Sequence, residues 1–245
     1  MLLYPLILLA LIVAGAGGYY AWRVYYSAEQ PLTKIPLGNK DRQHDTLLVL
    51  LPGISDSERD YLQHGFIDEI QKRQLPVDPM YVDARLHYYM AMTVVERLHT
   101  DVVEPALASG YRNIWLAGVS MGGFGALVYA NHYPDRVRGV IAMAPYLGKE
   151  RVIRKMVAGE DTEALASSRY KNTFRLWQWL TGYRQQAQAR PELFLAYGER
   201  DKFAEMNQLL ASQLPEGHTI YTNGQHDWVT WKKLWVSLLE KVDFN

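Results

Sequence analysis

The stretch "NIWLAGVSMGGFGALVYA", residues 113–130, constrains the fold of this chain more than any other part of the sequence. Residues 113–119 are an apolar run typical of a buried strand, and residues 121–130 continue with helical spacing. Ser120 lies between them, flanked by Gly118 and Gly122. Glycine at such positions allows a sharp turn and a close approach of neighbouring backbones. The stretch therefore predicts a strand, a tight turn at Ser120 and a helix.

Short apolar runs alternate with helical patterns along the rest of the chain. This alternation is typical of an α/β fold, and it predicts a mostly parallel sheet of about six strands with helices on both faces. The predicted strands are 46–51, 80–83, 113–119, 137–144, 193–198 and 219–222, and the predicted helices are 57–73, 90–109, 121–133, 203–213 and 228–242. Ligands of open parallel sheets bind at the carboxyl edge, where Ser120 is expected.

One interval interrupts the alternation. Residues 149–190 contain helix-like segments with Trp177, Trp179 and Tyr183 but no strand-like run. A parallel sheet needs only one crossover helix between two strands. We therefore interpret 149–190 as a helical lid insertion over the sheet.

The N-terminus carries no charged side chain before Arg23. About 20 apolar residues suffice to cross a bilayer, so residues 1–26 are predicted to be a transmembrane anchor, with a cleaved signal segment as the alternative. Residues 27–45 are polar and contain prolines, which predicts a linker to a domain at 46–245. Basic residues follow the apolar run and none precedes it, which predicts a single-pass membrane protein with the domain 46–245 on the cytoplasmic side.

Charge and cysteine content exclude several functions. Lys plus Arg total 26 and Asp plus Glu total 26, so no net field favours binding to nucleic acid. The chain has no cysteine, which excludes disulfides, thiol catalysis and thiolate metal sites.

A serine hydroxyl on the predicted turn becomes a nucleophile only when a base removes its proton. His226 lies in "YTNGQHDW", a polar loop after the last predicted strand, where it can bend back over the sheet edge. His218 opens that strand instead, and the other histidines fall in the linker or in helical stretches. His226 is therefore the predicted base.

The base needs a carboxylate partner, and the reaction needs hydrogen-bond donors for the negative charge that develops. Asp201 follows the predicted strand 193–198 and is the predicted partner, with Glu199 as the alternative. The N–H of Met121 and the N–H of Ile54, in "LLVLLPGISDS", are the predicted donors. The second loop also suits an ordinary turn in which Ser55 or Asp56 caps the next helix.

Residues 46–243 resemble the α/β-hydrolase family, and the chain order Ser120, Asp201, His226 is the order that this family uses. The resemblance implies a serine triad and neither a cofactor nor a metal. Only the predicted linker precedes residue 46, so we expect the family's first hairpin to be missing, and Leu51-Pro52-Gly53 stands where many members carry His-Gly before the oxyanion position.

These observations predict a serine hydrolase that cleaves carboxylic esters, of small molecules or of lipids, through an acyl-enzyme. Thioesterase, peptidase and acyltransferase activities on the same triad are the alternatives, as is a hydrolase-like binding protein without activity. The membrane would be a further partner through the N-terminal helix. The sequence fixes neither the acyl chain nor the oligomeric state.

Overall fold

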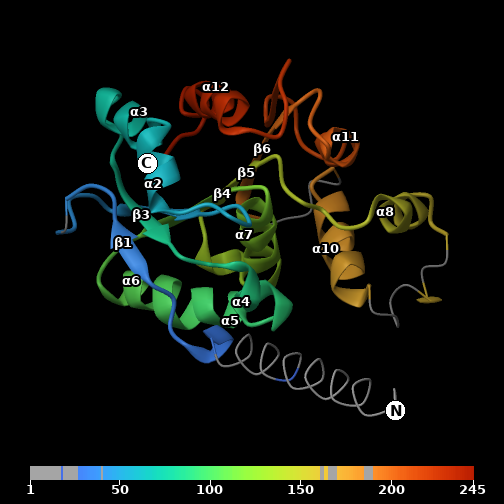
Figure 1. Cartoon of the computed structure of the whole chain (residues 1–245), viewed down its shortest axis with the longest axis horizontal. Coiled ribbons are helices and arrows are strands. Elements are labelled where there is room, and N and C mark those ends of the chain that lie inside the picture. The colour runs from blue at the N-terminus through green and yellow to red at the C-terminus, as the bar shows by residue number, and fades with distance from the viewer. Residues whose placement is uncertain (1–17, 19–26, 40, 161–162, 165–169, 185–189) are drawn as a thin grey trace, which may run out of the picture.

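A mostly parallel sheet forms the centre of the molecule (Figure 1). The computed structural model describes residues 18, 27–39, 41–160, 163–164, 170–184 and 190–245. Among them the sheet has seven strands in the order β1-β3-β2-β4-β5-β6-β7. β1 (Lys34–Pro36) is antiparallel to β3, and all other neighbours are parallel. The predicted α/β class is confirmed, with one strand more than expected.

All six strands predicted from the sequence are present. They are β2 (Thr46–Leu51), β3 (Val77–Val82), β4 (Asn113–Val119), β5 (Gly139–Met143), β6 (Glu192–Gly198) and β7 (Thr219–Thr222). β3 begins at Val77, before the predicted start at residue 80. Pro79 lies inside the strand, and a proline, which has no N–H to donate, argues against a central strand in a prediction from sequence. The Pro79 carbonyl still accepts a bond from Leu37 N–H at 2.9 Å.

Helices cover both faces of the sheet and define two hydrophobic cores. Along β2, Leu47, Val49 and Leu51 face one core, whereas Leu48 and Leu50 face the other, as the two-residue period of a strand requires. The second core is covered by α2 (Glu58–Gln63), α3 (Phe66–Lys72) and α12 (Trp228–Leu238). The first is covered by α5 (Val94–Leu98), η1 (His99–Val103), α6 (Glu104–Ala108), α7 (Met121–His132), α10 (Lys171–Thr181) and α11 (Ala204–Ala211). Short segments α4 (Leu86–Met90) and η2 (Pro134–Arg136) complete the connections.

The insertion at 149–190 contributes α8 (Glu150–Val157) and α10 to the described residues. Leu176, Trp177 and Leu180 of α10 are buried in the core that also contains side chains of α7. The Trp177 indole N–H donates to the Leu147 carbonyl at 3.1 Å. The described part of the insertion is thus anchored beside α7, and its action as a lid stays a prediction.

Residues 27–39 pack on the domain instead of forming a free linker. Ala28, Leu32 and Leu37 are buried, and the Leu32 N–H donates to Asp101 Oδ2 at 2.9 Å. β1 pairs with β3 within this segment. β1 has only three residues, which is too short to show a periodic pattern. The linker prediction therefore rested on polar composition, which does not reveal this strand.

No helix in the described part of the chain is long and apolar enough to cross a membrane. The longest, α7, has 12 residues, whereas a spanning helix needs about 20. This finding contradicts the prediction of a single-pass membrane protein with a cytoplasmic catalytic domain. The predicted anchor, residues 1–26, lies outside the described residues apart from Gly18.

Candidate active site

Ser120 occupies a strained turn between β4 and α7. Its backbone angles are φ 53° and ψ −112°, a region that residues with a side chain rarely adopt. The Ser120 N–H donates to the Met143 carbonyl at 2.8 Å, and the Ser120 carbonyl accepts from the N–H groups of Phe124 at 3.1 Å and Tyr146 at 3.2 Å. These bonds hold the serine at the carboxyl ends of β4 and β5.

The two glycines around Ser120 are required by close backbone contacts. A Cβ atom at Gly118 would lie 2.3 Å from the carbonyl carbon of Gly122, and one at Gly122 would lie 2.2 Å from the Leu51 carbonyl oxygen. Both distances are too short for non-bonded atoms, so neither position accepts a side chain without a backbone shift. The G-x-S-x-G pattern is thus a packing requirement of this turn.

Asp201 follows β6 on a tight turn closed by its own N–H, which donates to the Gly198 carbonyl at 3.0 Å. Its side chain is fully buried. One carboxylate oxygen, Oδ1, accepts from the Phe203 N–H at 2.7 Å. The other, Oδ2, lies 2.7 Å from His226 Nδ1. The carboxylate therefore has a fixed orientation toward the histidine.

His226 connects Asp201 to Ser120. Its Nε2 lies 3.0 Å from Ser120 Oγ. Since Nδ1 faces a carboxylate, the network assigns the proton to Nδ1 and leaves Nε2 to accept from the serine hydroxyl. The structure thus brings together the three side chains that the sequence placed at the carboxyl ends of separate strands.

Aromatic rings hold the imidazole from two sides. The Phe203 and Trp231 rings meet it edge to face, with centroids at 5.1 and 4.9 Å. The next residue, Asp227, caps α12 by accepting from the Thr230 N–H at 2.8 Å. That bond lowers the pKa of the Asp227 carboxyl. Asp227 therefore stabilises the start of α12 and the loop before it.

The alternatives to these residues lie elsewhere. His218 Nδ1 is 3.1 Å from the Leu193 carbonyl, and its ring stacks on Phe194 near the amino end of β6. Glu199 is exposed to solvent. Neither has a described contact with His226, so only Asp201 provides the histidine with a carboxylate.

The loop after β2 lies beside the turn at Ser120. Leu51 pairs with Gly118 in the sheet, and its carbonyl abuts Gly122. The side chain of Ile54 is 55% exposed, so it points away from the core. Met121 opens α7, where the first N–H groups of a helix have no acceptor within the helix. The two predicted donor positions thus come from segments adjacent to Ser120.

Asp56 is a residue of the site region whose role the sequence did not reveal. Its Oδ2 accepts from the Gly53 N–H at 3.1 Å, and its Oδ1 accepts from the Trp228 indole N–H at 3.3 Å. Burial raises the pKa of the Asp56 carboxyl, although the hydrogen bond from the Trp228 indole opposes the shift. The N-cap of α2 is Ser57, so Asp56 connects two loops and does not cap the helix.

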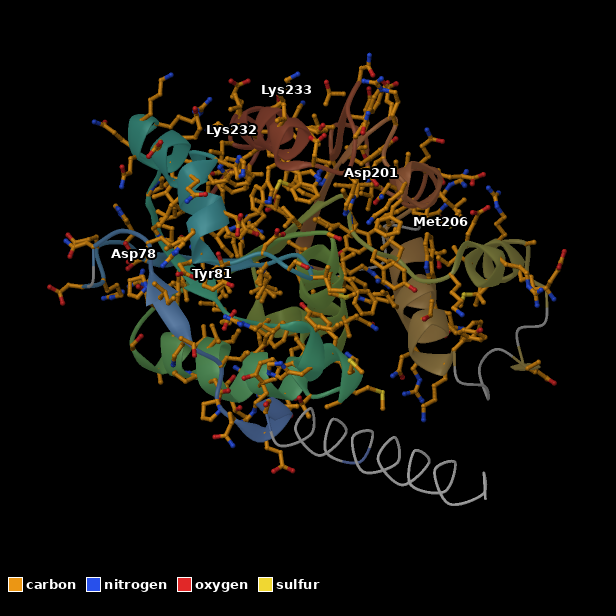
Figure 2. All side chains as sticks on the ribbon, in the orientation of Figure 1. Asp78, Tyr81, Asp201, Met206, Lys232 and Lys233 are labelled. Carbon is orange, nitrogen blue, oxygen red and sulfur yellow. The ribbon has the colours of Figure 1, made fainter. Side chains whose placement is uncertain are left out.

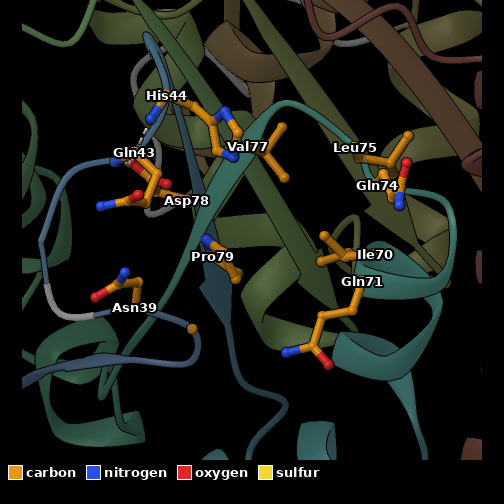
Figure 3. A pocket seen from close by; sticks show the side chains of 11 residues that line it. Asn39, Gln43, His44, Ile70, Gln71, Gln74, Leu75, Val77, Asp78 and Pro79 are labelled. Atoms are coloured by element: carbon orange, nitrogen blue, oxygen red, sulfur yellow. Dashed lines mark hydrogen bonds between the residues drawn. The ribbon is translucent and has the colours of Figure 1, made fainter.

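Figure 3 shows a second feature of the molecule, a cavity of about 330 Å³ whose lining includes none of these residues. It is lined by residues before β2, by the end of α3 and by the start of β3, and so it lies at the amino edge of the sheet. Its Asp78 already accepts from the backbone of Gln43 and His44. Figure 2 shows Asp78 and Asp201 on opposite sides of the molecule.

Solved structures of hydrolases share this architecture. S-formylglutathione hydrolase from Staphylococcus aureus is 16% identical, with a TM-score of 0.57 and 82% of each chain covered. A ferulic acid esterase is 18% identical, with a TM-score of 0.55 and coverage of 82% of this chain and 85% of that chain. An α/β-hydrolase from a sediment metagenome of the Mar Chica lagoon, Morocco, is 19% identical, with a TM-score of 0.57 and coverage of 86% and 94%. The chain therefore has the α/β-hydrolase fold.

A sequence model of the family described as "Putative esterase" matches residues 97–241, which is more than half of the chain. The chain belongs to this esterase family. Membership supports the hydrolysis of ester bonds in general and a small-molecule ester as substrate. A search of curated proteins found no match to the chain.

Proposed function

We propose that this protein is a serine esterase that cleaves carboxylic esters through an acyl-enzyme. The observation that carries the proposal is the unbroken series of hydrogen bonds from Ser120 Oγ to His226 Nε2 at 3.0 Å and from His226 Nδ1 to Asp201 Oδ2 at 2.7 Å. A base next to the hydroxyl makes serine nucleophilic, and a buried carboxylate stabilises the imidazolium that forms.

In the first half of the reaction, Ser120 Oγ attacks the ester carbonyl carbon while His226 Nε2 takes the hydroxyl proton. The carbonyl oxygen becomes negatively charged and accepts from the N–H groups of Met121 and Ile54. Met121 stands at the N-terminus of α7, where the helix dipole favours negative charge. The carbon–oxygen bond to the alcohol then breaks, and the departing oxygen takes the proton from Nε2.

In the second half, a water molecule attacks the acyl group on Ser120 and gives a proton to His226 Nε2. The bond between the acyl carbon and Oγ breaks, and Oγ takes that proton back. The products are a carboxylic acid and an alcohol, and the enzyme returns to its starting state. Asp201 keeps its negative charge throughout.

Thioesters, amides and acceptors other than water could use the same triad, but membership in an esterase family favours oxygen esters. The backbone of Ser120 argues against a binding protein without activity. A residue with a side chain and a positive φ carries strain of about 1–3 kcal/mol. Such strain is found mainly at functional sites, where the surrounding structure holds the residue in place.

The test uses the full-length protein, a fluorophosphonate probe and p-nitrophenyl acetate. Ser120→Ala is expected to abolish labelling and to lower ester turnover by at least about 10³-fold, with an unchanged circular dichroism spectrum. Ser212→Ala, at an exposed residue after α11, is the matched control and should keep both activities. Labelling of the Ser120 variant would refute the proposal.

A further inference from the structure

A groove of about 190 Å³ runs along the outer side of α7, between α5 and α10; Figure 1 shows α7 next to both helices. Most of its lining is apolar, from Tyr89, Met92, Val94, Val95, Phe124 and Val128. Asn131, His132, Asn172 and Arg175 add polar groups. A mostly apolar wall with a few polar side chains is the composition of small-molecule sites.

The groove begins close to the proposed nucleophile. Phe124 and Val128 follow Ser120 at intervals of four residues, so they share one side of the helix. With a rise of about 1.5 Å per residue, they lie roughly 6 and 12 Å along the axis from Ser120, and His132 lies roughly 18 Å away. A substrate arm of about this length would reach the far end of the groove.

A continuous line of aromatic rings joins the groove to the histidine. Tyr89 packs against Phe124, Phe124 against Tyr146, Tyr146 against Phe203, and Phe203 against His226, with centroids 6.4, 6.0, 5.6 and 5.1 Å apart. The four tyrosine and phenylalanine residues are only partly buried. A series of ring contacts therefore links the wall of the groove to the imidazole of the proposed reaction centre.

Met92 borders the groove in an unusual conformation. It is 73% exposed and has a φ of 59°, a value that costs free energy in a residue with a side chain. Its sulfur lies 3.7 Å from the Asn172 side-chain nitrogen on α10. This contact connects the loop after α4 to α10, and the flexible thioether suits a wall that adapts to an apolar ligand.

Arg175 provides the groove with a positive charge. Its side chain is exposed, and it has no carboxylate partner within the described ranges. By contrast, Arg154 on the neighbouring helix α8 is paired with Glu150 at 2.9 Å. A guanidinium beside apolar surface, with no carboxylate partner among the described residues, favours a ligand that combines an apolar chain with an anionic group.

We propose that the groove binds an apolar arm of the ester substrate and that Arg175 binds a carboxylate carried on that arm. The inference rests on the proposed function, because the ester must react at Ser120. It assigns the substrate to esters with an anionic, chain-like arm, on either the acyl or the alcohol side.

The experiment compares kcat/KM of the full-length protein for matched p-nitrophenyl esters. The monoester of sebacic acid carries a carboxylate on its acyl chain, decanoate has the same chain length without the charge, and acetate has no arm. ω-Acetoxydecanoate, an alkyl ester followed by acid release and compared with decyl acetate, places the charge on the alcohol side. We expect one of the two charged esters to be preferred over its neutral counterpart.

Arg175→Gln should lower kcat/KM for that charged ester by about tenfold relative to kcat/KM for acetate, as the loss of one charged hydrogen bond does. Lys171→Gln, an exposed cation one turn earlier on α10, is the control and should leave all esters unchanged. Val128→Trp should fill the groove and lower turnover of the long esters only, whereas Leu62→Trp on α2 should not.

Equal effects of Arg175→Gln on charged and neutral esters would overturn the assignment of the anionic group. Suppose that acetate turnover depends on Ser120, but that neither the arm of the ester nor Val128→Trp changes kcat/KM. This result would overturn the inference about the groove and leave the proposed function standing. A wild-type protein that hydrolyses none of these esters and does not react with a fluorophosphonate would overturn both.

Discussion

Asp56 joins two loops that approach the candidate site from distant parts of the chain. One of its oxygens accepts from the Gly53 N–H, next to the proposed donor Ile54. The other accepts from the indole of Trp228, which opens the helix after His226. Asp56 is therefore a positioning residue, since it contacts neither Ser120 nor His226 through a hydrogen bond among the described residues.

Asp56→Asn tests how the buried charge affects stability. Burial raises the pKa of Asp56 above 3.8, so the folded state holds this proton more tightly than the unfolded state. The wild type is therefore favoured at acidic pH and loses this advantage as pH rises from about 3.8 through the folded pKa. The free energy of unfolding of the wild type minus that of the variant should fall across this window.

Urea unfolding of both proteins at a series of pH values measures that difference. A difference independent of pH would mean that the carboxyl has the same pKa in both states. A difference that rises with pH would mean that Asp56 is stabilised as an anion, against the direction derived from its burial.

Ser120, Asp201 and His226 could be found from the sequence because each follows a strand that the apolar pattern reveals. Their catalytic roles stay predictions. Asp56 and Trp228 could not be paired in the same way, because 172 positions separate them and no local pattern links them. The spacing of Asp56 three residues after Gly53 is a weak signal, since it equally suits a helix cap.

Helix α12 begins two residues after His226 and fixes the loop that carries it. Asp227 accepts from the Thr230 N–H, and the Thr230 hydroxyl accepts from the Gln225 N–H at 3.0 Å. The two bonds thus hold the residues directly before and after His226. The orientation of the imidazole therefore depends on the start of this helix.

Asp227→Ala should destabilise the protein by about 1 kcal/mol, the usual cost of losing an N-cap, and should lower kcat because the loop around His226 loosens. Asp227→Asn keeps an oxygen acceptor and should retain most of the stability. Thermal unfolding and p-nitrophenyl acetate kinetics measure both effects. Equal losses in the two variants would show that the charge of Asp227, and not its cap bond, matters.

Long elements were easier to predict than short ones. The predicted helix 90–109 appears as α5, η1 and α6, and the end of α4 overlaps its start. β1 was missed because three residues carry no period, and because its partner β3 contains Pro79, which normally indicates an edge. Such a short strand forms because it pairs with a distant strand in the folded protein, and the local sequence pattern does not show this pairing.

At the scale of the whole molecule, the C-terminus closes the second core. Phe244 is 2% exposed, packs against Trp115 with ring centroids 5.4 Å apart, and its carbonyl accepts from the Thr46 hydroxyl at 2.8 Å. The last residues of the chain thus contact the start of β2 and the centre of the sheet.

Phe244→Ala should lower the free energy of unfolding by about 3–5 kcal/mol, because it leaves a cavity beside Trp115. Leu62→Ala, at a residue that is 46% exposed, should change it by less than about 0.5 kcal/mol. Chemical denaturation measures both variants. A small loss for Phe244→Ala would show that the second core does not depend on the C-terminal residues.

The architecture was predictable at this scale because alternating strands and helices allow few arrangements of a parallel sheet. The side of the sheet that each helix covers could not be predicted, since a helix with an apolar stripe can pack on either face. The prediction of a membrane-spanning helix rested on a long uncharged apolar run, and the described helices are too short to support it.

His226 lies 106 positions after Ser120, on the last loop before the final helix. During translation, the growing polypeptide therefore exposes its serine long before it possesses the proposed base, and the second core cannot bury Phe244 until that residue has been made. Under the proposed mechanism, a chain that stops before His226 is expected to be inert toward esters. Reaction with a serine-directed probe would accordingly report finished, folded molecules and none of their precursors.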